Sequence, residues 1–541
     1  MLHPRWWAKR YRLTISARIV QIIVQCKALL HLVPDGRDRY TSLGFGLGVC
    51  MSLLYEWLDK AAGARQGAMG GGQALIYRDT YLSWPGLRHR VNRRASELKG
   101  FGIEAGDWVG LMLGGVPDFV VLALALSKLD AVVVPLDPTL GGRDLNMVFA
   151  AAHLRALVTR PNTLTPFAAP AGAPPADGSH ERPRAVLESR RRVSGTLLTC
   201  ATFERKPLKL HVVPEVVLFT LDAGGDPKGV VRERRQLEGI GAAVGATLEI
   251  DAKTRVSTAA GLHTSQGFDL GLCAALAQGA GLVLDDEFVA ARLAKLLSEH
   301  GADVLAATPA LFAAMARMPT AKPCRSRRTR CISSGESLTP AVARAFRKRF
   351  KVPLFSCYQA VETGPVAIDL AGRNPTTVGL PFAGVEIRTA DRQGNQMPTG
   401  VRGLVWVRAA GVSATFVPPV RLRTRDSEVP IGRGLRDGWL RTGDIGSLGR
   451  DGRLTLFGRE DDLVKVDGRR VALGEVEGCL EAFANVRSAE ARLERDEVGG
   501  SRVIARVQRD GRCTPKQLID HCAKHLAPHK VPARVEFGEG G

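Results

Sequence analysis

The chain has 541 residues, 45% of them hydrophobic, and a formal net charge of +21 at pH 7. One hydrophobic core rarely extends over this length, so the sequence predicts two or more domains with globular cores. The ten cysteines form no C-x-x-C pair, which argues against a disulfide framework or structural zinc and favours reduced thiols in a cytoplasmic compartment. The charge alone leaves nucleic acid, an anionic membrane surface and an anionic small molecule open as partners.

Residues 1–50 differ in composition from the rest, because they are rich in Arg, Lys and Trp and carry no acidic residue before Asp35. The segment Arg18–Val33 could form a basic amphipathic helix. Equally, Met51 begins a segment typical of the first helix of a domain, so residues 1–50 could derive from an upstream start codon. We treat residues 1–50 as an N-terminal extension without an assigned role.

After Met51 the pattern is that of a layered α/β domain, since short β-rich runs such as Trp108–Leu113 alternate with helical patterns such as Leu82–Gly102. The longest apolar run, Phe119–Leu136, is interrupted by Lys128 and Asp130. It predicts a buried helix followed by a strand, and we expect no transmembrane segment.

Two basic runs, Arg182–Arg192 and Cys324–Arg330, lack the aromatic residues that stack bases in a groove for single-stranded nucleic acid. They are typical of a solvated basic face, and we expect no nucleic-acid partner. The first run lies in a segment rich in Ala, Pro, Gly and Arg between Pro161 and Ser194, which predicts an exposed excursion.

Toward the C-terminus, residues 446–461 predict two strands joined by a turn at Asp451 and Gly452, followed by a helix over Ala472–Phe483. This pattern places a domain boundary near Gly458. We therefore expect a large domain over residues 51–458 and a small domain of strands and helices over residues 459–541.

The run GGDPKG, Gly224–Gly229, follows the apolar segment Glu215–Phe219. A strand that enters such a turn is typical of a phosphate-binding loop, because glycines let backbone N–H groups approach an anion and a lysine adds positive charge. An ordinary turn is the alternative, and the run alone does not decide between them.

Five stretches occur in a fixed order: TLDAGGDPKGVV (220–231), CISSGESLTP (331–340), SCYQAVETGP (356–365), GWLRTGDIG (438–446) and GREDDLVKVDGRRVALGEVE (458–477). Together they resemble motifs of the AMP-forming adenylating enzymes, which include acyl-CoA synthetases, aryl-CoA ligases, luciferases and the adenylation domains of nonribosomal peptide synthetases. The resemblance covers about residues 52–541 and implies an α/β fold, with a large multi-layer adenylation domain and a small α+β lid domain.

In that family, a carboxylate attacks the α-phosphate of Mg-ATP to give an acyl-adenylate and pyrophosphate, and a thiol, usually of coenzyme A, then displaces AMP. Such chemistry needs phosphate donors, a metal that offsets charge, a ribose anchor and a lid that excludes water before it admits the thiol.

The resemblance implies the nucleotide-binding residues. Asp444 of RTGD is expected to accept hydrogen bonds from both ribose hydroxyls, and Arg459 of GRED to reach the ribose or the phosphates. In YQAVETG, Tyr358 is expected to flank the adenine and Glu362 to bind magnesium. The expected wall of the adenine site comprises Gly335, Glu336 and Ser337.

The remaining roles concern the phosphates and the lid. Thr220, Gly225 and Lys228 match phosphate-loop residues of the family, and Lys228 and Glu362 are the expected catalytic residues. Asp461 resembles the hinge about which the small domain turns. Gly468 resembles the glycine that lines the pantetheine tunnel, where a missing side chain leaves space for the thiol arm. Arg470 resembles a nearby basic residue that helps the thiol-forming conformation, and the charged surface of a β-hairpin is the alternative for it.

The motifs also depart from the family. Residues 221–224 replace Ser, Gly, Thr and Thr by Leu, Asp, Ala and Gly, which removes three hydroxyl donors, each typically worth about 3 kcal/mol to a transition state. Gln359 replaces a glycine of the family motif. Val361 replaces a threonine whose hydroxyl contacts phosphate or the reacting carboxylate. His263 lies one place from the register of the acyl-pocket histidine, and a histidine at the edge of the core is an equal alternative.

The family's C-terminal glycine–lysine pair, whose lysine bridges the carboxylate and the α-phosphate, has no match before the chain ends. Lys530 lies in the preceding connection between helix and strand and is not its equivalent. A truncated reading frame and a diverged protein that does not adenylate both stay open.

Three functions follow from these observations. The leading hypothesis is an acid–thiol ligase for a fatty or other hydrophobic carboxylic acid, active in fatty acid metabolism, which uses ATP, Mg²⁺ and coenzyme A or a carrier-protein thiol. The second is a pseudoenzyme that binds nucleotide or acyl-adenylate and serves as a partner or regulatory module. A nucleic-acid-binding protein ranks last, because only the charge favours it.

Overall fold

The structure of this chain is a computed structural model, and the residues it describes are 52–66, 72–140, 142–161, 187–204, 208, 210–221, 227–336, 338–372, 377–391, 394–417, 435–459, 464–466, 469–471, 473–481, 483, 485–495, 501–509 and 511–538. The chain divides into two units, residues 1–50 and 51–541. The amphipathic helix predicted within residues 1–50 lies outside the described residues.

One eight-stranded sheet contains the strand that leads into the predicted phosphate loop. Its order is β19-β9-β8-β4-β3-β5-β7-β6, and β8, β4, β3 and β5 are parallel neighbours. The strands are β3 (Trp108–Met112), β4 (Val132–Pro135), β5 (Ala156–Thr159), β6 (Leu187–Arg192), β7 (Thr199–Phe203), β8 (Val216–Leu221), β9 (Pro227–Arg232) and β19 (Phe416–Val417).

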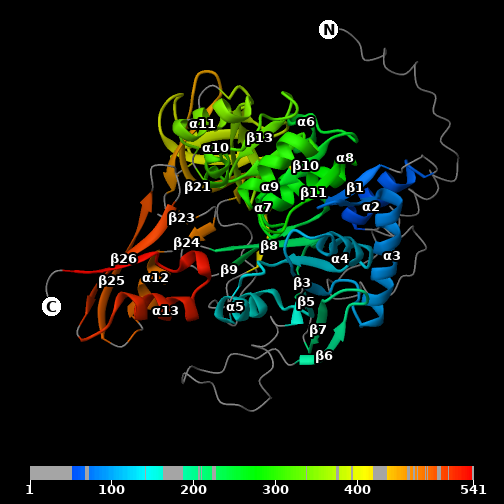
Figure 1. Cartoon of the computed structure of the whole chain (residues 1–541), viewed down its shortest axis with the longest axis horizontal. Coiled ribbons are helices and arrows are strands. Elements are labelled where there is room, and N and C mark those ends of the chain that lie inside the picture. The colour runs from blue at the N-terminus through cyan, green and yellow to red at the C-terminus, as the bar shows by residue number, and fades with distance from the viewer. Residues whose placement is uncertain are drawn as a thin grey trace, which may run out of the picture. The chain divides into compact units, whose positions relative to one another are not determined.

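The apolar run Phe119–Leu136 is a helix and a strand, as predicted. Helix α4 (Pro117–Lys128) connects β3 to β4, and all four residues of β4 are buried, as expected of a parallel strand covered on both faces. Helix α4 packs against α2 (Leu53–Gly63) and α3 (Trp84–Gly100), and the three helices lie together in blue and cyan in Figure 1. Among the described residues, no helix is both long and apolar enough to span a membrane.

A nine-stranded sheet forms the second layer, in the order β16-β15-β14-β13-β12-β10-β11-β1-β2. Its strands are β1 (Gln73–Tyr77), β2 (Thr80–Ser83), β10 (Arg255–Thr258), β11 (Gly281–Leu284), β12 (Val304–Ala307), β13 (Arg330–Ser333), β14 (Leu354–Ala360), β15 (Gly364–Ile368) and β16 (Leu380–Pro381). Helix α6 (Arg234–Thr247) leads from β9 into this sheet at β10. The helices that follow, up to β14, are α7 (Ser265–Gly267), a π-helix over Phe268–Cys273, α8 (Ala274–Gln278), α9 (Ala290–Lys295), a π-helix over Leu296–His300, α10 (Pro309–Arg317) and α11 (Pro340–Phe350).

A five-stranded antiparallel sheet carries the predicted hairpin. It contains β17 (Glu386–Ala390), β18 (Gly403–Arg408), β20 (Leu435–Arg436), β21 (Trp439–Leu448) and β22 (Leu454–Arg459). Strands β21 and β22 are joined by the expected turn at Asp451 and Gly452, and Gly452 has φ +77°, a conformation that side-chain-bearing residues rarely adopt.

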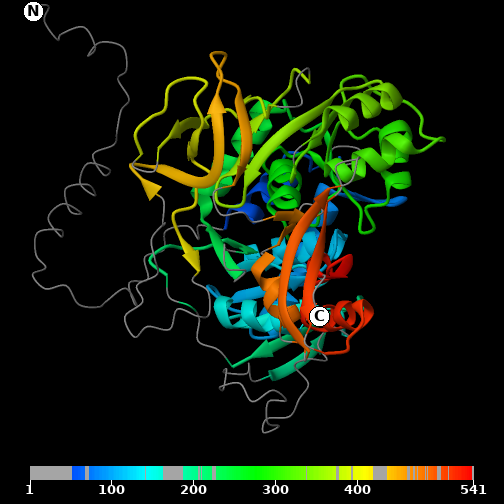
Figure 2. The same cartoon turned by 90° about the vertical axis from the view of Figure 1, so that its left-hand side faces the viewer.

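The elements after Arg459 build a separate hydrophobic cluster, whose buried members all lie between Val466 and Val535. These elements are β23 (Val464–Val466), β24 (Arg469–Val471), α12 (Leu473–Glu481), β25 (Val486–Arg495), β26 (Ser501–Arg509), α13 (Pro515–His525), a 3₁₀ turn over Pro528–Lys530 and β27 (Arg534–Phe537). Figure 2 shows the long antiparallel pair β25 and β26 side by side.

Part of the expected excursion between Pro161 and Ser194 is instead an edge strand. Residues 162–186 lie outside the described residues, but β6 pairs antiparallel with β7, with a register shift between Leu187 and Ser189. Arg190, Arg191 and Arg192 on β6 are exposed, in agreement with a solvated basic face, and charges on an edge strand discourage pairing with another chain. The eight cysteines among the described residues are free thiols.

Candidate functional site

A cavity of about 800 Å³ lies where several parallel strands end. Its walls include residues one or two positions after the ends of β4, β10, β12 and β13, together with Gln359–Val361 at the end of β14. Ligands of open α/β sheets commonly bind beyond the carboxyl ends of the strands. The sequence motifs at 331–340 and 356–365 therefore meet at one place, although they lie on different strands.

The predicted phosphate loop is the connection of a hairpin. Strands β8 and β9 pair antiparallel, with Thr220 opposite Lys228, and Thr220 lines the cavity. Residues 222–226, which include Gly225, lie outside the described residues. The apolar segment before the loop is a buried strand, as predicted.

The two expected catalytic residues form an ion pair. The Nζ of Lys228 on β9 lies 2.9 Å from Oε1 of Glu362, which sits in the turn after β14. The lysine also lies 4.6 Å from the ring centroid of Phe416. Lys228 and Glu362 thus neutralise each other. When magnesium and phosphate bind, the phosphate would pair with Lys228 and the cation with Glu362.

Tyr358 and Asp444, 86 residues apart in the sequence, meet in the interior. The hydroxyl of Tyr358 on β14 donates a hydrogen bond of 2.5 Å to Oδ2 of Asp444 on β21. Burial, reinforced by the Asp444 charge, raises the pKa of Tyr358 well above its usual value. Tyr358 therefore keeps its proton at neutral pH and acts as the donor to the carboxylate.

The remaining predicted residues are placed as follows. Gly335 lines the cavity with φ +99°, a backbone conformation that favours glycine. Glu336 directly follows it, and Ser337 lies outside the described residues. The backbone of Arg459 on β22 pairs with that of Asp444, so Gly458 and Arg459 of GRED lie on the strand next to RTGD. Asp461 and Gly468 lie outside the described residues, and Arg470 is on β24.

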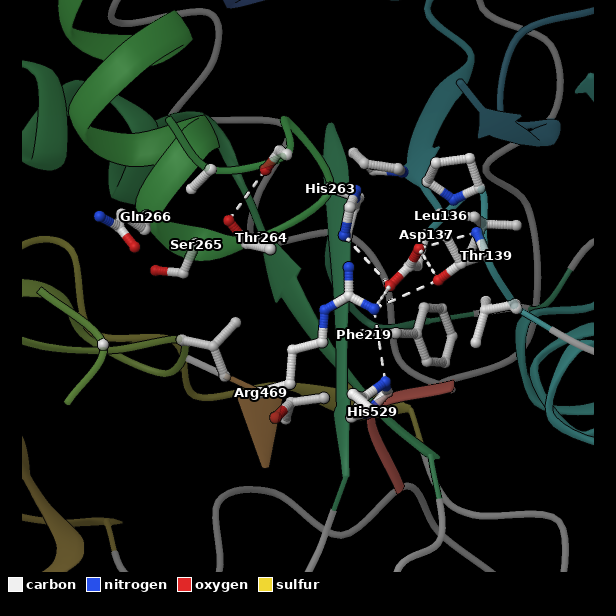
Figure 3. Close-up of a pocket in the computed structure, with 18 of the residues that line it drawn as sticks. Leu136, Asp137, Thr139, Phe219, His263, Thr264, Ser265, Gln266, Arg469 and His529 are labelled. Atoms are coloured by element: carbon white, nitrogen blue, oxygen red, sulfur yellow. Dashed lines mark hydrogen bonds and ion pairs between the residues drawn. The ribbon is translucent and has the colours of Figure 1, made fainter. Parts of the chain in front are cut away.

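Asp137 is the centre of a polar cluster that sequence reasoning missed (Figure 3). Its Oδ2 lies 3.0 Å from Nη1 of Arg469 and 3.5 Å from Nε2 of His263. Its Oδ1 accepts hydrogen bonds from the backbone N–H and the hydroxyl of Thr139. Burial alone raises the pKa of Asp137, but the hydrogen bond and charge of His263 and the charge of Arg469 outweigh it and hold that pKa well below its usual range.

His529 completes this cluster from the 3₁₀ turn of the C-terminal elements. An arginine can only donate, so Arg469 donates to Nδ1 of His529, at 3.3 Å, and the ring proton sits on Nε2. Burial, with the charges of Arg469 and Lys530, lowers the pKa of His529 to about 3. His529 is therefore neutral at pH 7.

His263 and Lys530 both reach the cavity wall. The ring of His263 lies over Gly261, where an added Cβ would be 2.2 Å from Cε1, so the glycine leaves room for the imidazole. Lys530 lies between α13 and β27, as predicted, is 2% exposed, and places Nζ 3.5 Å from Oδ2 of Asp144 on α5 (Gly142–Ala152).

The residues that the sequence did not single out had weak signals. Asp137 follows a buried parallel strand by two residues, a position at which ligand-binding side chains often occur. Arg469 directly precedes the predicted Arg470, and the alternation of side chains along a strand decides which of the two faces the cavity. Nothing local distinguishes His529 from a surface histidine.

A fully buried ion pair supports the turn that carries Glu362. Arg232 and Asp269 are both 0% exposed and lie 3.5 Å apart. The guanidinium also donates to the backbone oxygens of Val361 and Gly411. Because Val361 lines the cavity, Arg232 fixes the backbone of this wall from behind.

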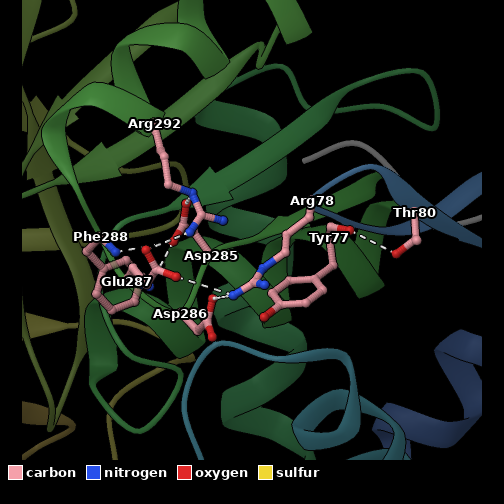
Figure 4. A network of polar contacts seen from close by, with 8 residues as sticks. All are labelled: Tyr77, Arg78, Thr80, Asp285, Asp286, Glu287, Phe288 and Arg292. Atoms are coloured by element: carbon pink, nitrogen blue, oxygen red, sulfur yellow. Dashed lines mark hydrogen bonds and ion pairs between the residues drawn. The ribbon is translucent and has the colours of Figure 1, made fainter.

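The loop after β11 forms another part of the wall, since Asp286 and Phe288 line the cavity. Figure 4 shows how this loop is held by two arginines. Arg78 lies 3.4 Å from Asp286, and Arg292 lies 3.3 Å from Asp285. Oδ1 of Asp285 also accepts hydrogen bonds from the backbone N–H groups of Glu287 and Phe288. Ion pairs and backbone hydrogen bonds thus both hold the loop in place.

Comparison with known protein families matches residues 64–417, more than half of the chain, to a family described as AMP-binding enzyme. Surfactin synthase subunit 3 of Bacillus subtilis is 25% identical over 553 residues, which cover 98% of this chain but only 41% of that protein. The chain thus spans less than half the length of this synthase. Indoleacetate–CoA ligase of Aromatoleum aromaticum is 24% identical over 505 residues, covering 90% of this chain and 94% of that protein.

Among solved structures, the amide bond synthetase McbA of Marinactinospora thermotolerans matches with a TM-score of 0.73 and 25% identity. The match covers 91% of this chain and 96% of that one.

Proposed function

Because the chain belongs to the family of AMP-binding enzymes, we propose that this adenylate-forming ligase activates a hydrophobic carboxylic acid, a fatty acid among the candidates, and transfers the acyl group to coenzyme A. The observation that carries this proposal is the ion pair of Lys228 with Glu362 beside the cavity. It joins a residue that we propose to bind phosphate to one that we propose to bind the metal, and the two directly follow Pro227 and Val361, which line the cavity.

In the first step of this proposal, a carboxylate oxygen of the acid attacks the α-phosphorus of ATP, and the bond from that phosphorus to the bridging oxygen breaks as pyrophosphate leaves. Lys228, Thr220 and Gly225 hold the phosphates. In the second step, the thiol sulfur attacks the acyl carbon and AMP departs. A carrier-protein thiol is the alternative acceptor, which the similarity to surfactin synthase supports.

A magnesium ion fits Glu362, because Mg²⁺ is usually bound by one or two carboxylates together with substrate phosphates. When bound, the ion would offset phosphate charge in the first step. Asp444 is proposed to bind the ribose hydroxyls, Tyr358 to flank the adenine, and Arg459 to reach the ribose or phosphates. The proposed adenine wall is Gly335, Glu336 and Ser337.

We propose that residues 51–458 form the adenylation domain and residues 459–541 a lid domain, with Asp461 as hinge and Gly468 and Arg470 beside the thiol path. The separate hydrophobic cluster of the C-terminal elements supports this division, because a domain that turns as a body needs its own core.

A pseudoenzyme that binds nucleotide without adenylating is the second candidate. The buried Val361 favours it, because this residue lines the cavity where the family's threonine supplies a hydroxyl. The three hydroxyl donors missing from residues 221–224 point the same way.

The test is carboxylate-dependent ATP–pyrophosphate exchange with short, medium, long-chain and aryl acids. We expect exchange above the blank without acid, and an approximately hundredfold or greater loss in Lys228→Ala, as typically follows removal of one preorganised donor. Lys295→Ala, whose side chain is 61% exposed, is the control. Folded protein that binds AMP but exchanges with no acid would reject the ligase in favour of the pseudoenzyme.

A further inference from the structure

The cavity offers an apolar wall without a free charge. Its apolar lining includes Leu136, Leu140, Met147, Val148, Phe219 and Leu311. Each described acidic side chain in the wall has a basic partner: Asp137 with Arg469, Asp144 with Lys530 and Asp286 with Arg78. A second charged group on a bound acid would meet charges that already have partners, and this favours an acid whose body is uncharged.

Gln266 is a polar exception in this wall. It lies on the single-turn helix α7, is 6% exposed and lines the cavity, and Figure 3 shows it beside Ser265. Its Nε2 is buried and has no hydrogen-bond partner among the described residues. The hydroxyls of its neighbours are satisfied inside the protein, since Thr264 donates to the oxygen of Gly261 and Ser265 to Asp269.

Gln359 is the second exception. It stands near the end of β14, lines the same cavity, and its Oε1 is buried without a hydrogen-bond partner in the part of the chain that the structure describes. Helix α7 packs against β14, so the two carboxamides belong to adjoining parts of the wall. A buried polar group without a partner is rare in a folded protein, and two on adjoining elements indicate a partner that the described residues do not supply.

We propose that the cavity selects carboxylic acids whose apolar body carries one uncharged hydrogen-bonding substituent, such as a hydroxyl or a carboxamide, and that Gln266 and Gln359 recognise this substituent. The proposal rests on the proposed function and narrows its substrate class. A carboxamide presents a donor at one end and an acceptor at the other, so two of them together match a group that both donates and accepts. An unsubstituted alkyl chain offers no hydrogen bond to Nε2 of Gln266 or to Oε1 of Gln359.

This arrangement discriminates more strongly than an apolar wall can. A hydrophobic pocket distinguishes one methylene by about 10- to 200-fold, whereas a site built to hydrogen-bond a substrate group rejects the analogue that lacks it by up to about 10⁵-fold. For the two carboxamides we expect a preference of about tenfold or more within matched pairs of acids.

The experiment measures binding and turnover separately. Calorimetry in the presence of AMP gives the affinity for phenylpropanoic, naphthoic and octanoic acid, each beside its hydroxylated and carboxamide-bearing derivatives. ATP–pyrophosphate exchange is then measured with the same acids. The proteins are the wild type, Gln266→Met, Gln359→Met and the control Gln396→Met. Gln396 is an exposed residue whose backbone forms an antiparallel bridge with Ala390, the last residue of β17.

We expect at least one polar derivative to bind the wild type and the control about tenfold or more tightly than its parent acid, and this preference to fall below threefold in Gln266→Met or Gln359→Met. Gln266→Met should fold with an unchanged or higher melting temperature, because it removes an unpaired buried amide. A lowered melting temperature would indicate that Gln266 has a structural partner, which counts against the proposal.

The inference is overturned if no acid binds, if each parent acid binds as tightly as its polar derivatives, or if the preference survives in both variants. A preference in binding without any exchange supports the inference and rejects only the ligase activity. Exchange without a preference rejects the inference and keeps the ligase.

Discussion

Arg469, the first residue of β24, places Nη1 3.0 Å from Oδ2 of Asp137, which lies two residues after the end of β4. This contact ties the C-terminal elements to the wall of the cavity, and Lys530 with Asp144 forms a second tie beside it. The proposed lid therefore meets the cavity wall through charged pairs, which suits a contact that has to be broken and remade.

Asp137→Asn should weaken this closure. The amide oxygen can still accept from Thr139, but the charge opposite Arg469 is lost, and a hydrogen bond to a charged group typically contributes about 1.5–3 kcal/mol. We expect amide hydrogen exchange in β24 and at His529 and Lys530 to accelerate by about 10- to 100-fold. Glu386→Gln removes an exposed ion pair with Arg408 and should leave these rates unchanged; equal rates in Asp137→Asn would show that the pair does not hold the lid.

Asp444→Ala should weaken AMP binding by about tenfold or more, because two charge-assisted hydrogen bonds to the ribose would be lost. Tyr358→Phe keeps both the aromatic ring and the Asp444 carboxylate, so its AMP affinity should stay within about threefold of wild type. Calorimetric titration with AMP checks both values. Wild-type affinity in Asp444→Ala would reject the ribose assignment.

Glu215 links stability to pH at the start of the strand that leads into the phosphate loop. Its Oε2 accepts the backbone N–H of Leu53 at 2.8 Å, and burial raises its pKa to about 7. The folded state thus binds this proton more tightly than the unfolded state, so the stabilisation is full below about pH 4.5 and is lost as pH rises through 7.

Glu215→Gln keeps an oxygen for Leu53 and cannot ionise. We expect it to match the wild type at pH 5 and to be more stable at pH 8 by about 1–3 kcal/mol, measured by urea unfolding. Glu490→Gln, which changes an exposed residue of β25, should show no such dependence. A difference that is constant between pH 5 and 8 would contradict a raised pKa of Glu215.

Arg232→Met should destabilise the protein by about 3–5 kcal/mol, because it leaves the buried Asp269 without an opposite charge. The double variant Arg232→Met with Asp269→Leu removes both charges and should recover part of this loss. Urea unfolding of Arg232→Met, Asp269→Leu and the double variant measures the coupling free energy between the two charges. Losses that simply add would show that the two charges do not depend on each other.

Local patterns predicted much of the fold. The helix and strand within Phe119–Leu136, the strand at Glu215–Phe219 and the hairpin around Gly452 follow from hydrophobic periodicity and turn chemistry, which act between near neighbours. The edge strand β6 was missed because its arginine-rich sequence has no apolar alternation. The segment is a strand because its backbone hydrogen-bonds to β7.

The sequence by itself determined the family resemblance and the residues proposed for the nucleotide, because motif spacing is a property of the chain alone. Only the tertiary structure decided which of them meet: Lys228 with Glu362 and Tyr358 with Asp444. It also revealed Asp137 with its partners, and Nε2 of Gln266 and Oε1 of Gln359, which have no hydrogen-bond partner among the described residues. Whether a polar side chain is satisfied depends on groups far away in sequence, and folding alone brings these groups within hydrogen-bond distance.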